Sequence, residues 1–151
     1  MQKPLTDAEK AVDAIIKESI KPYANRSEVL VDYTQDDGAS WRIIPKNPHA
    51  ALLRIYNVGK DVINIDVDDL YWIELFGDDR KIAIFKAHLE ALLGGRAVSW
   101  HDPKTLEKTR PKTILEVDTG DKKPFCWTGN ILFPSRFKRR KGVIKKEYQG
   151  Y

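Results

Sequence analysis

Two carboxylates lie two positions apart in an acidic stretch near the middle of the chain. Asp66 and Asp68 project from one face if a β-strand continues through Val67, because alternate residues of a strand share a face. Such a pair can hold Mg²⁺ with water in the remaining positions, and Asp121-Lys122-Lys123 could add an acidic-x-Lys element to it. The competing interpretation, a solvated strand end and turn, is the one we prefer. We therefore predict no metal site and no cofactor, and keep a metal-dependent hydrolase using Asp66 and Asp68 as an alternative.

The other reactive side chains form no catalytic motif. The histidines (His49, His88 and His101) lie far apart and make no His-x-x-x-His pair. We expect a structural or surface role for His88. His101 and Asp102 are adjacent, but neighbours on a strand point to opposite faces, which argues against a dyad. Cys126 has aromatic neighbours on both sides, which predicts a small buried side chain. We predict a non-enzymatic protein with no catalytic residues.

Two helices are predicted from the spacing of apolar residues. Thr6 and Glu9 form a capping-box pattern ahead of a helix over residues 7–20, which ends near Pro22. Asp78-Asp79 opens a second helix, where carboxylates favour the positive N-terminal end. Gly94-Gly95 closes it, because glycine accepts the left-handed conformation that ends many helices.

Period-two alternation predicts the strands. Five short runs joined by turns lie between the helices, at about residues 29–33, 41–45, 53–55, 63–67 and 70–76. Three weaker runs follow at residues 97–100, 113–117 and 125–133, with a polar loop over residues 102–112. We expect an α+β fold, a curved antiparallel meander sheet of about 6–8 short strands with two amphipathic helices packed on one face.

Composition limits the class of protein. The chain has 151 residues, which suits one domain, over residues 1–135, followed by a basic tail at 136–151. Its single cysteine allows no internal disulfide and fits a reducing compartment. No stretch approaches the ~18 apolar residues of a membrane span, and the N-terminal residues do not form an apolar signal core. We expect a cytoplasmic protein with no membrane partner, and its oligomeric state stays open.

The segment from Asp61 to Asp79 holds seven acidic residues and no basic one. If Tyr71, Ile73 and Leu75 face the helices, the alternate residues from Leu70 to Phe76 form an apolar face that contains an acid. Aromatic side chains anchor protein interfaces, and carboxylates around them steer a basic partner. The competing interpretation is that both faces of this strand are buried. We predict a protein-binding surface made of Asp66, Asp68, Asp69, Trp72, Glu74, Phe76, Asp78 and Asp79.

Part of this segment has a familiar pattern. Residues 72–79 (WIELFGDD), a helix ending at residues 89–96 (LEALLGGR) and the strand that follows resemble a pattern in bacterial immunity proteins of polymorphic toxin systems. Those are small cytoplasmic α+β proteins that bind and block a toxin domain. The resemblance implies an inhibitor that covers the active site of a cognate toxin. The basic tail departs from an acidic inhibitor matched to a basic nuclease, so the class of toxin stays open.

Positive charge is concentrated in the tail, and the rest of the chain is mildly acidic. Residues 136–151 carry seven basic residues and one acidic residue, and the other residues carry 19 basic and 21 acidic ones. The tail gives an alternative function, weak and salt-dependent nucleic-acid binding in which Phe137 or Tyr148 stacks on a base. Two further interpretations are a tail folded over the acidic segment of its own body and a solvated terminus. The nucleic-acid-binding residues would be Arg136, Lys138, Arg139, Arg140, Lys141, Lys145 and Lys146.

Overall fold

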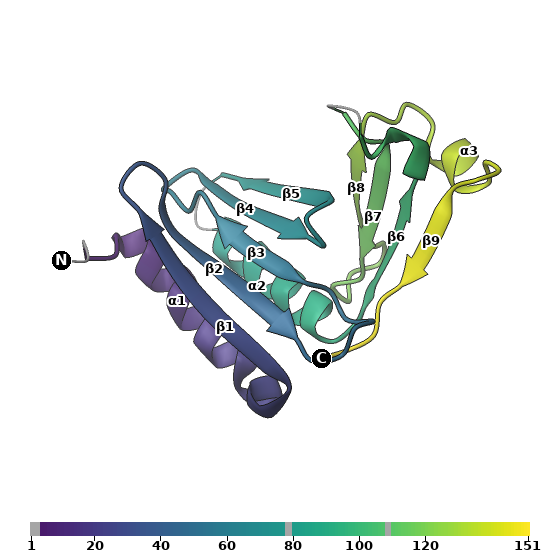
Figure 1. Cartoon of the computed structure of the whole chain (residues 1–151). Helices are drawn as coiled ribbons and strands as arrows, with labels where there is room; N and C mark the ends of the chain where they lie inside the picture. Colours follow the sequence, from purple (N-terminus) through teal and green to yellow (C-terminus); the bar gives the residue numbers. More distant parts are fainter. Residues whose placement is uncertain (1–3, 78–79, 108–109) are drawn as a thin grey trace.

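The computed structural model describes residues 4–77, 80–107 and 110–151 and confirms the α+β class (Figure 1). One antiparallel sheet has the order β1-β2-β3-β4-β5 and consists of β1 (Ser27–Thr34), β2 (Gly38–Pro45), β3 (Leu53–Tyr56), β4 (Val62–Val67) and β5 (Tyr71–Phe76). A second has the order β8-β7-β6-β9 and consists of β6 (Ala97–His101), β7 (Thr113–Val117), β8 (Phe125–Gly129) and β9 (Ile144–Glu147). The helical elements are α1 (Asp7–Ile20), η1 (Lys21–Arg26), α2 (Arg80–Leu93), η2 (Pro103–Thr105) and α3 (Pro134–Lys138).

The first helix begins with the predicted capping box. Thr6 Oγ1 accepts from the Glu9 amide at 3.2 Å, and Glu9 Oε2 accepts from the Thr6 amide at 3.2 Å. Asp13 Oδ1 accepts from Trp41 Nε1 at 3.0 Å, which fixes α1 against β2. Among the helices of the described residues, none has the length and hydrophobicity of a membrane-spanning segment.

Consecutive antiparallel pairings build the first sheet, as its alternating sequence predicted. Trp41, Ile43, Ile55, Ile65 and Ile73 point to one side and are fully buried in the core that α1 and α2 share with this sheet. Burying a large apolar side chain of this kind stabilises a fold by about 1.5–3 kcal/mol. Figure 1 shows both helices on the same side of the sheet, so its other side, the open face, has no helix over it.

The second sheet packs on α2 with one side and on α3 with the other. On the α2 side, the His88 ring contacts Phe125 and Trp127, with ring centres 4.7 and 5.7 Å apart. On the other side, Phe137 of α3 joins Trp100 and Ile114 in a small second core. Figure 1 shows the two sheets diverging like the arms of a V, with the C-terminus at the point where they approach each other.

The expectation of one curved sheet with about 6–8 strands is not confirmed, because nine strands in the described residues form two sheets. After β5 the chain enters α2, and Gly95 then adopts a left-handed φ of 73° before β6 begins. This turn directs β6 to pair with β7 and β9 instead of extending the first sheet beyond β5.

Residues 136–151, expected as a basic tail, contain most of α3 and all of β9. β9 pairs antiparallel with β6, with Lys145 opposite Trp100 and Lys146 opposite Ser99. Beyond β9, Tyr148 and Tyr151 are only 6% and 5% exposed and belong to the main core. The C-terminal segment, residues 144–151, is therefore an integral part of the packed structure.

Candidate functional site

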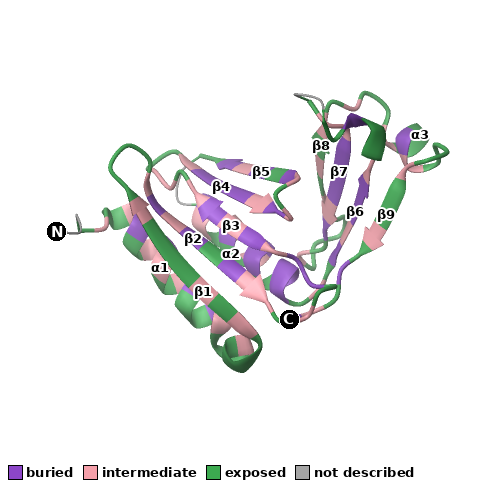
Figure 2. Ribbon diagram, in the orientation of Figure 1, coloured by how far each residue is buried: buried purple, intermediate pink, exposed green. Residues whose placement is uncertain are grey.

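The open face of the first sheet carries large exposed aromatic side chains on its edge strand. Along β5, Tyr71, Ile73 and Leu75 are buried, whereas Trp72 and Phe76 are 57% and 66% exposed. Figure 2 shows this alternation of buried and exposed residues along β5. Exposed apolar patches often mark interaction sites, so this face is a candidate binding surface.

Strand register places further side chains beside these aromatics. Asp66 lies opposite Trp72, and Arg54 lies opposite Asp66. Arg42 continues this row, because it is paired with Arg54. Across β2 to β5, the open face therefore has an acidic and aromatic half on β4 and β5 and a cationic half on β2 and β3. Its principal residues are Arg42, Arg54, Tyr56, Asp66, Trp72, Glu74 and Phe76.

Asp66 is fixed in the centre of this face. Its Oδ1 accepts from the Tyr56 hydroxyl at 3.0 Å, and the Arg54 guanidinium lies 4.7 Å from the centre of the Tyr56 ring. Burial raises the pKa of Asp66, and the Tyr56 hydrogen bond and the Arg54 charge partly oppose that rise. Burial, followed by the charge of Asp66, raises the pKa of Tyr56 to about 12. The three side chains therefore form one ordered polar cluster.

Asp68 does not belong to the open face. β4 ends at Val67, and Asp68 and Asp69 form a turn with left-handed φ values of 55° and 54°. The strand does not continue through Val67 into Asp68, so the pairing of Asp66 and Asp68 on one strand face is wrong. In the described residues, no three His, Cys, Asp or Glu side chains are grouped so that they could hold a metal ion.

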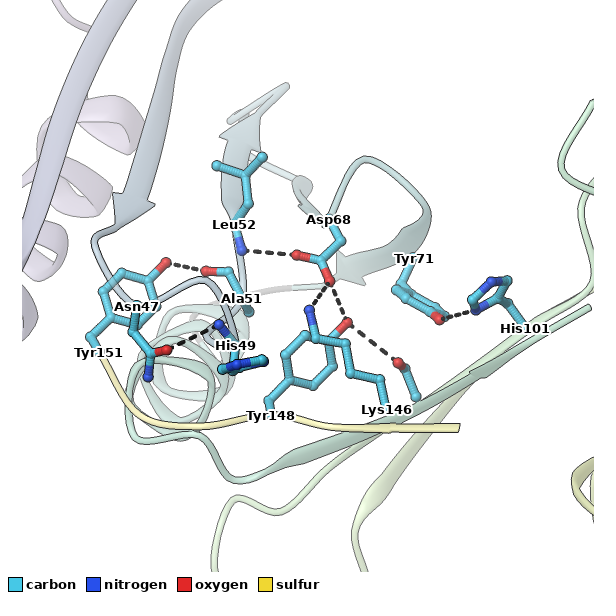
Figure 3. A network of polar contacts seen from close by, with 11 residues as sticks. Asn47, His49, Ala51, Leu52, Asp68, Tyr71, His101, Lys146, Tyr148 and Tyr151 are labelled. Carbon is cyan, nitrogen blue, oxygen red and sulfur yellow. Dashed lines mark hydrogen bonds and ion pairs between the residues drawn. The ribbon is translucent and has the colours of Figure 1, made fainter. Parts of the chain in front are cut away.

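Asp68 instead joins the two sheets (Figure 3). One carboxylate oxygen accepts from the Leu52 amide at 3.0 Å. The other accepts from Lys146 Nζ at 3.1 Å and from the Tyr148 hydroxyl at 2.7 Å. Ser99 Oγ in turn donates to the Tyr148 hydroxyl oxygen at 3.3 Å. This is a contact between the basic tail and the acidic segment of the same chain, the arrangement that one sequence interpretation anticipated.

Tyr151 makes the second connection of the C-terminal segment. Its hydroxyl donates to the carbonyl oxygens of Ile43, at 3.1 Å, and Ala51. Its amide donates to the Leu93 carbonyl oxygen at 3.0 Å. Burial raises the pKa of Tyr151 well above its usual range, so the phenol stays protonated as a donor.

The side chains of His88 and His101 have structural partners. His88 is fully buried, its Nδ1 lies 2.9 Å from the Ile84 carbonyl oxygen, and its Nε2 accepts from Trp127 Nε1 at 3.2 Å. Burial lowers the pKa of His88, which fits this neutral form. His101 Nδ1 lies 3.2 Å from the Tyr71 hydroxyl, and Asp102 caps η2 through the Lys104 amide at 3.1 Å. Asp102 therefore does not orient His101 as a catalytic acid would.

The prediction that Cys126 is buried is wrong. Phe125 and Trp127 point toward α2, so alternation along β8 places Cys126 on the other side, where it is exposed. Burial of its sulfur and the nearby Glu116 charge raise the pKa of the thiol. Such a cysteine is accessible but poorly activated as a nucleophile.

The predicted nucleic-acid-binding residues divide into two groups. Lys138 pairs with Glu116, Lys145 with Glu147 at 3.2 Å and Lys146 with Asp68. The others, Arg136, Arg139, Arg140 and Lys141, are exposed on and just beyond α3. Of the predicted protein-binding residues, Asp78 and Asp79 lie outside the described residues, and Asp69 is exposed in the turn beside Asp68.

Sequence reasoning missed the cationic half of the open face. The period-two alternation that predicts the strand at residues 41–45 puts Arg42 on the side opposite to Trp41 and Ile43, so its outward position could have been predicted. Its alignment with Arg54 and Asp66 depends on the register of three strands, which the sequence does not specify. Comparison of the chain with protein-family models, curated protein sequences and solved structures found no match to any of them.

Proposed function

We propose that this chain is a non-enzymatic protein-binding protein that docks a partner protein on the open face of its first sheet. The observation that carries the proposal is the pair of exposed aromatics, Trp72 and Phe76, with Glu74 between them on β5. Aromatic side chains of this kind supply most of the binding free energy in protein interfaces when a partner covers them.

The charges of the open face support a protein ligand with mixed charge. Asp66 and Glu74 accompany the aromatics, and Arg42 and Arg54 lie on the neighbouring strands. A partner with cations opposite the first pair and acids opposite the second would be held in one orientation, because reversed docking brings like charges together. The ordered cluster of Arg54, Tyr56 and Asp66 lowers the entropic cost of binding, since its side chains are already fixed.

The resemblance of residues 72–100 to immunity proteins suggests the class of partner. We infer that the partner is a toxin domain and that the chain neutralises it in the bacterial cytoplasm by covering its active site. The α+β fold and the exposed β5 face support this inference. Asp69, in the turn before β5, would extend the contact, whereas Asp68 is already engaged by Lys146 and Tyr148. Asp78 and Asp79 stay part of the proposed surface from the sequence alone.

The test is binding and protection with the protein encoded beside this gene. The two chains are co-expressed and purified, their affinity is measured by calorimetry, and cell survival is scored with the neighbour expressed alone or with this chain. Trp72→Ala should weaken binding by about 2 kcal/mol or more, roughly 30-fold, as truncation of a central aromatic residue does. Leu106→Ala is the matched control, because Leu106 is 45% exposed but lies outside the open face.

Two results would contradict these assignments separately. If the neighbour binds and Trp72→Ala with Phe76→Ala binds it as tightly as the natural chain, the open face is not the interface. If the neighbour is toxic and this chain neither binds it nor restores growth, the immunity function is wrong. Circular dichroism of each variant checks folding, which substitution of exposed side chains should not disturb.

A further inference from the structure

A second surface, on the far side of the second sheet, has a different chemistry. From Lys122 to Lys146 the chain contains nine basic residues and no acidic one. The basic corner, residues 130–141 together with Lys112, forms a hollow of about 400 Å³. Apolar groups of Ile131, Leu132 and Phe133 line it, and Lys112, Arg136 and Arg140 surround them.

The aromatic side chains that could stack on a ligand here differ from those expected from the sequence. Phe137 and Tyr148 are 5% and 6% exposed, so neither can stack on a base. Phe133 is 63% exposed at the entry to α3, and its ring centre lies 5.5 Å from the Arg136 guanidinium. An exposed aromatic ring and a cation therefore lie side by side.

The basic corner is held in position before any ligand binds. Asn130 takes a left-handed φ of 56°, and its side-chain amide donates to the Pro111 carbonyl oxygen at 3.2 Å. The Phe137 amide donates to the Phe133 carbonyl oxygen at 3.0 Å, and the Phe137 ring is buried in the second core. Phe133 therefore projects from an anchored turn, which lowers the entropic cost of stacking on it.

Several cations in and beside the basic corner have no acidic partner. Lys138, Lys145 and Lys146 form ion pairs within the protein. In contrast, no ion pair within the described part of the chain involves Lys112, Arg136, Arg139, Arg140 or Lys141. These five side chains can neutralise the charges of an anionic ligand at little cost to the fold.

We propose that the basic corner is a binding site for single-stranded nucleic acid, with Phe133 stacking on a base and Arg136, Arg140 and Lys112 contacting phosphates. Single-strand sites combine aromatic platforms with a cationic groove, because each nucleotide brings a flat ring and a negative charge together. The Phe133 ring and the neighbouring Arg136 guanidinium match this combination of a flat ring and a charge in one nucleotide. In an anionic bilayer the charged headgroups lie apart from the apolar interior. A bilayer therefore matches a ring and a guanidinium in direct contact less well than a nucleotide does. This site lies on different elements from the open face and does not depend on the proposed docking of a protein there.

The test is fluorescence anisotropy of the full chain with labelled single-stranded oligothymidylate and oligouridylate. The logarithm of the binding constant should fall with the logarithm of salt concentration with a slope of about −2, since each of the three cations proposed to contact phosphates contributes roughly −0.7. Phe133→Ala and Phe133→Leu should each weaken binding by about tenfold, because stacking requires the ring. Arg136→Gln with Arg140→Gln should reduce the slope by about 1.4. Lys10→Gln is the control, because Lys10 is exposed on α1, and it should change neither the affinity nor the salt slope.

A substitution at Leu132 distinguishes nucleic-acid binding from membrane binding. Leu132 is 89% exposed beside Phe133 but has no ring, so Leu132→Ala should leave oligonucleotide affinity within about twofold. On vesicles containing phosphatidylglycerol, membrane insertion would make Leu132→Ala harmful and Phe133→Leu harmless. That vesicle pattern without oligonucleotide binding would overturn the proposal. So would oligonucleotide binding that is insensitive to salt or unchanged in Phe133→Leu.

Discussion

Replacing Asp68 by alanine removes the carboxylate that connects the two sheets. The lost contacts are the acceptors for the Leu52 amide, for Lys146 Nζ and for the Tyr148 hydroxyl. The substitution also places alanine at a left-handed φ of 55°. Asp69→Ala is a matched control, because Asp69 has a φ of 54° in the same turn but is exposed.

The size of the effect follows from these contacts. Hydrogen bonds to a charged group are worth about 1.5–3 kcal/mol each, whereas a partly exposed ion pair such as Asp68–Lys146 adds about 1 kcal/mol at most. Water can replace part of what is lost, since the Asp68 side chain is 24% exposed. We therefore expect Asp68→Ala to lower the free energy of unfolding by about 3 kcal/mol more than Asp69→Ala. For a chain of this length that difference is a fall in Tm of roughly 10 °C.

Urea denaturation measures the prediction directly. The midpoint should shift with little change in the slope of free energy against urea, because the native state stays compact. A double-mutant cycle with Tyr148→Phe should give a coupling of about 1.5 kcal/mol for the hydroxyl–carboxylate contact. If Asp68→Ala and Asp69→Ala differ by less than about 0.5 kcal/mol, within the range of ordinary surface substitutions, the carboxylate does not stabilise the joint between the sheets.

Three further outcomes are expected. Burial lowers the pKa of His88 below its unfolded value of 6.5, so the unfolded state takes up the proton first and the free energy of unfolding should fall as pH drops below 6.5. In His88→Gln the pH dependence of stability should weaken, because there is then no imidazole whose protonation breaks the hydrogen bond from Trp127 Nε1. His49→Gln, at an exposed position, should leave the dependence unchanged. Gly95→Ala should cost about 2 kcal/mol or more, since φ is 73° and a Cβ would meet the backbone of the C-terminal segment. Limited proteolysis should then cut that segment faster, and unchanged cleavage would contradict its close packing. Cys126 should react with a thiol reagent in the native state but more slowly than a free cysteine, because its pKa is raised. Labelling only after unfolding would show that it is buried.

The local features of the fold could be predicted from the sequence. The capping box, the 7–20 helix and the five strands of the first sheet depend on residues close together in the chain, and the structure confirms them. The alternation that exposes Trp72 and Phe76 is local too, so these residues could be found in advance. The role of this surface in binding remains a proposal.

Long-range features could not be predicted. Lys145 and Lys146 make β9 look like a solvated tail, because what stabilises β9 is pairing with β6, more than forty residues earlier in the chain. Asp68 looked like a partner for Asp66, whereas its turn directs it to Tyr148. The exposure of Phe133 could not be predicted either, because it depends on how α3 packs beneath it.

The C-terminal segment also has a consequence for the order in which the protein folds. The first sheet is made of consecutive hairpins, whereas Tyr148 reaches Asp68 across 80 residues and Tyr151 reaches Ile43 across 108. Contacts at such separations carry the largest loop-closure entropy and form late. Tyr151→Phe should therefore speed unfolding and leave the folding rate nearly unchanged, which stopped-flow kinetics can measure. During synthesis of the chain, the contacts of Tyr148 and Tyr151 that connect the two sheets can form only after these residues have been made.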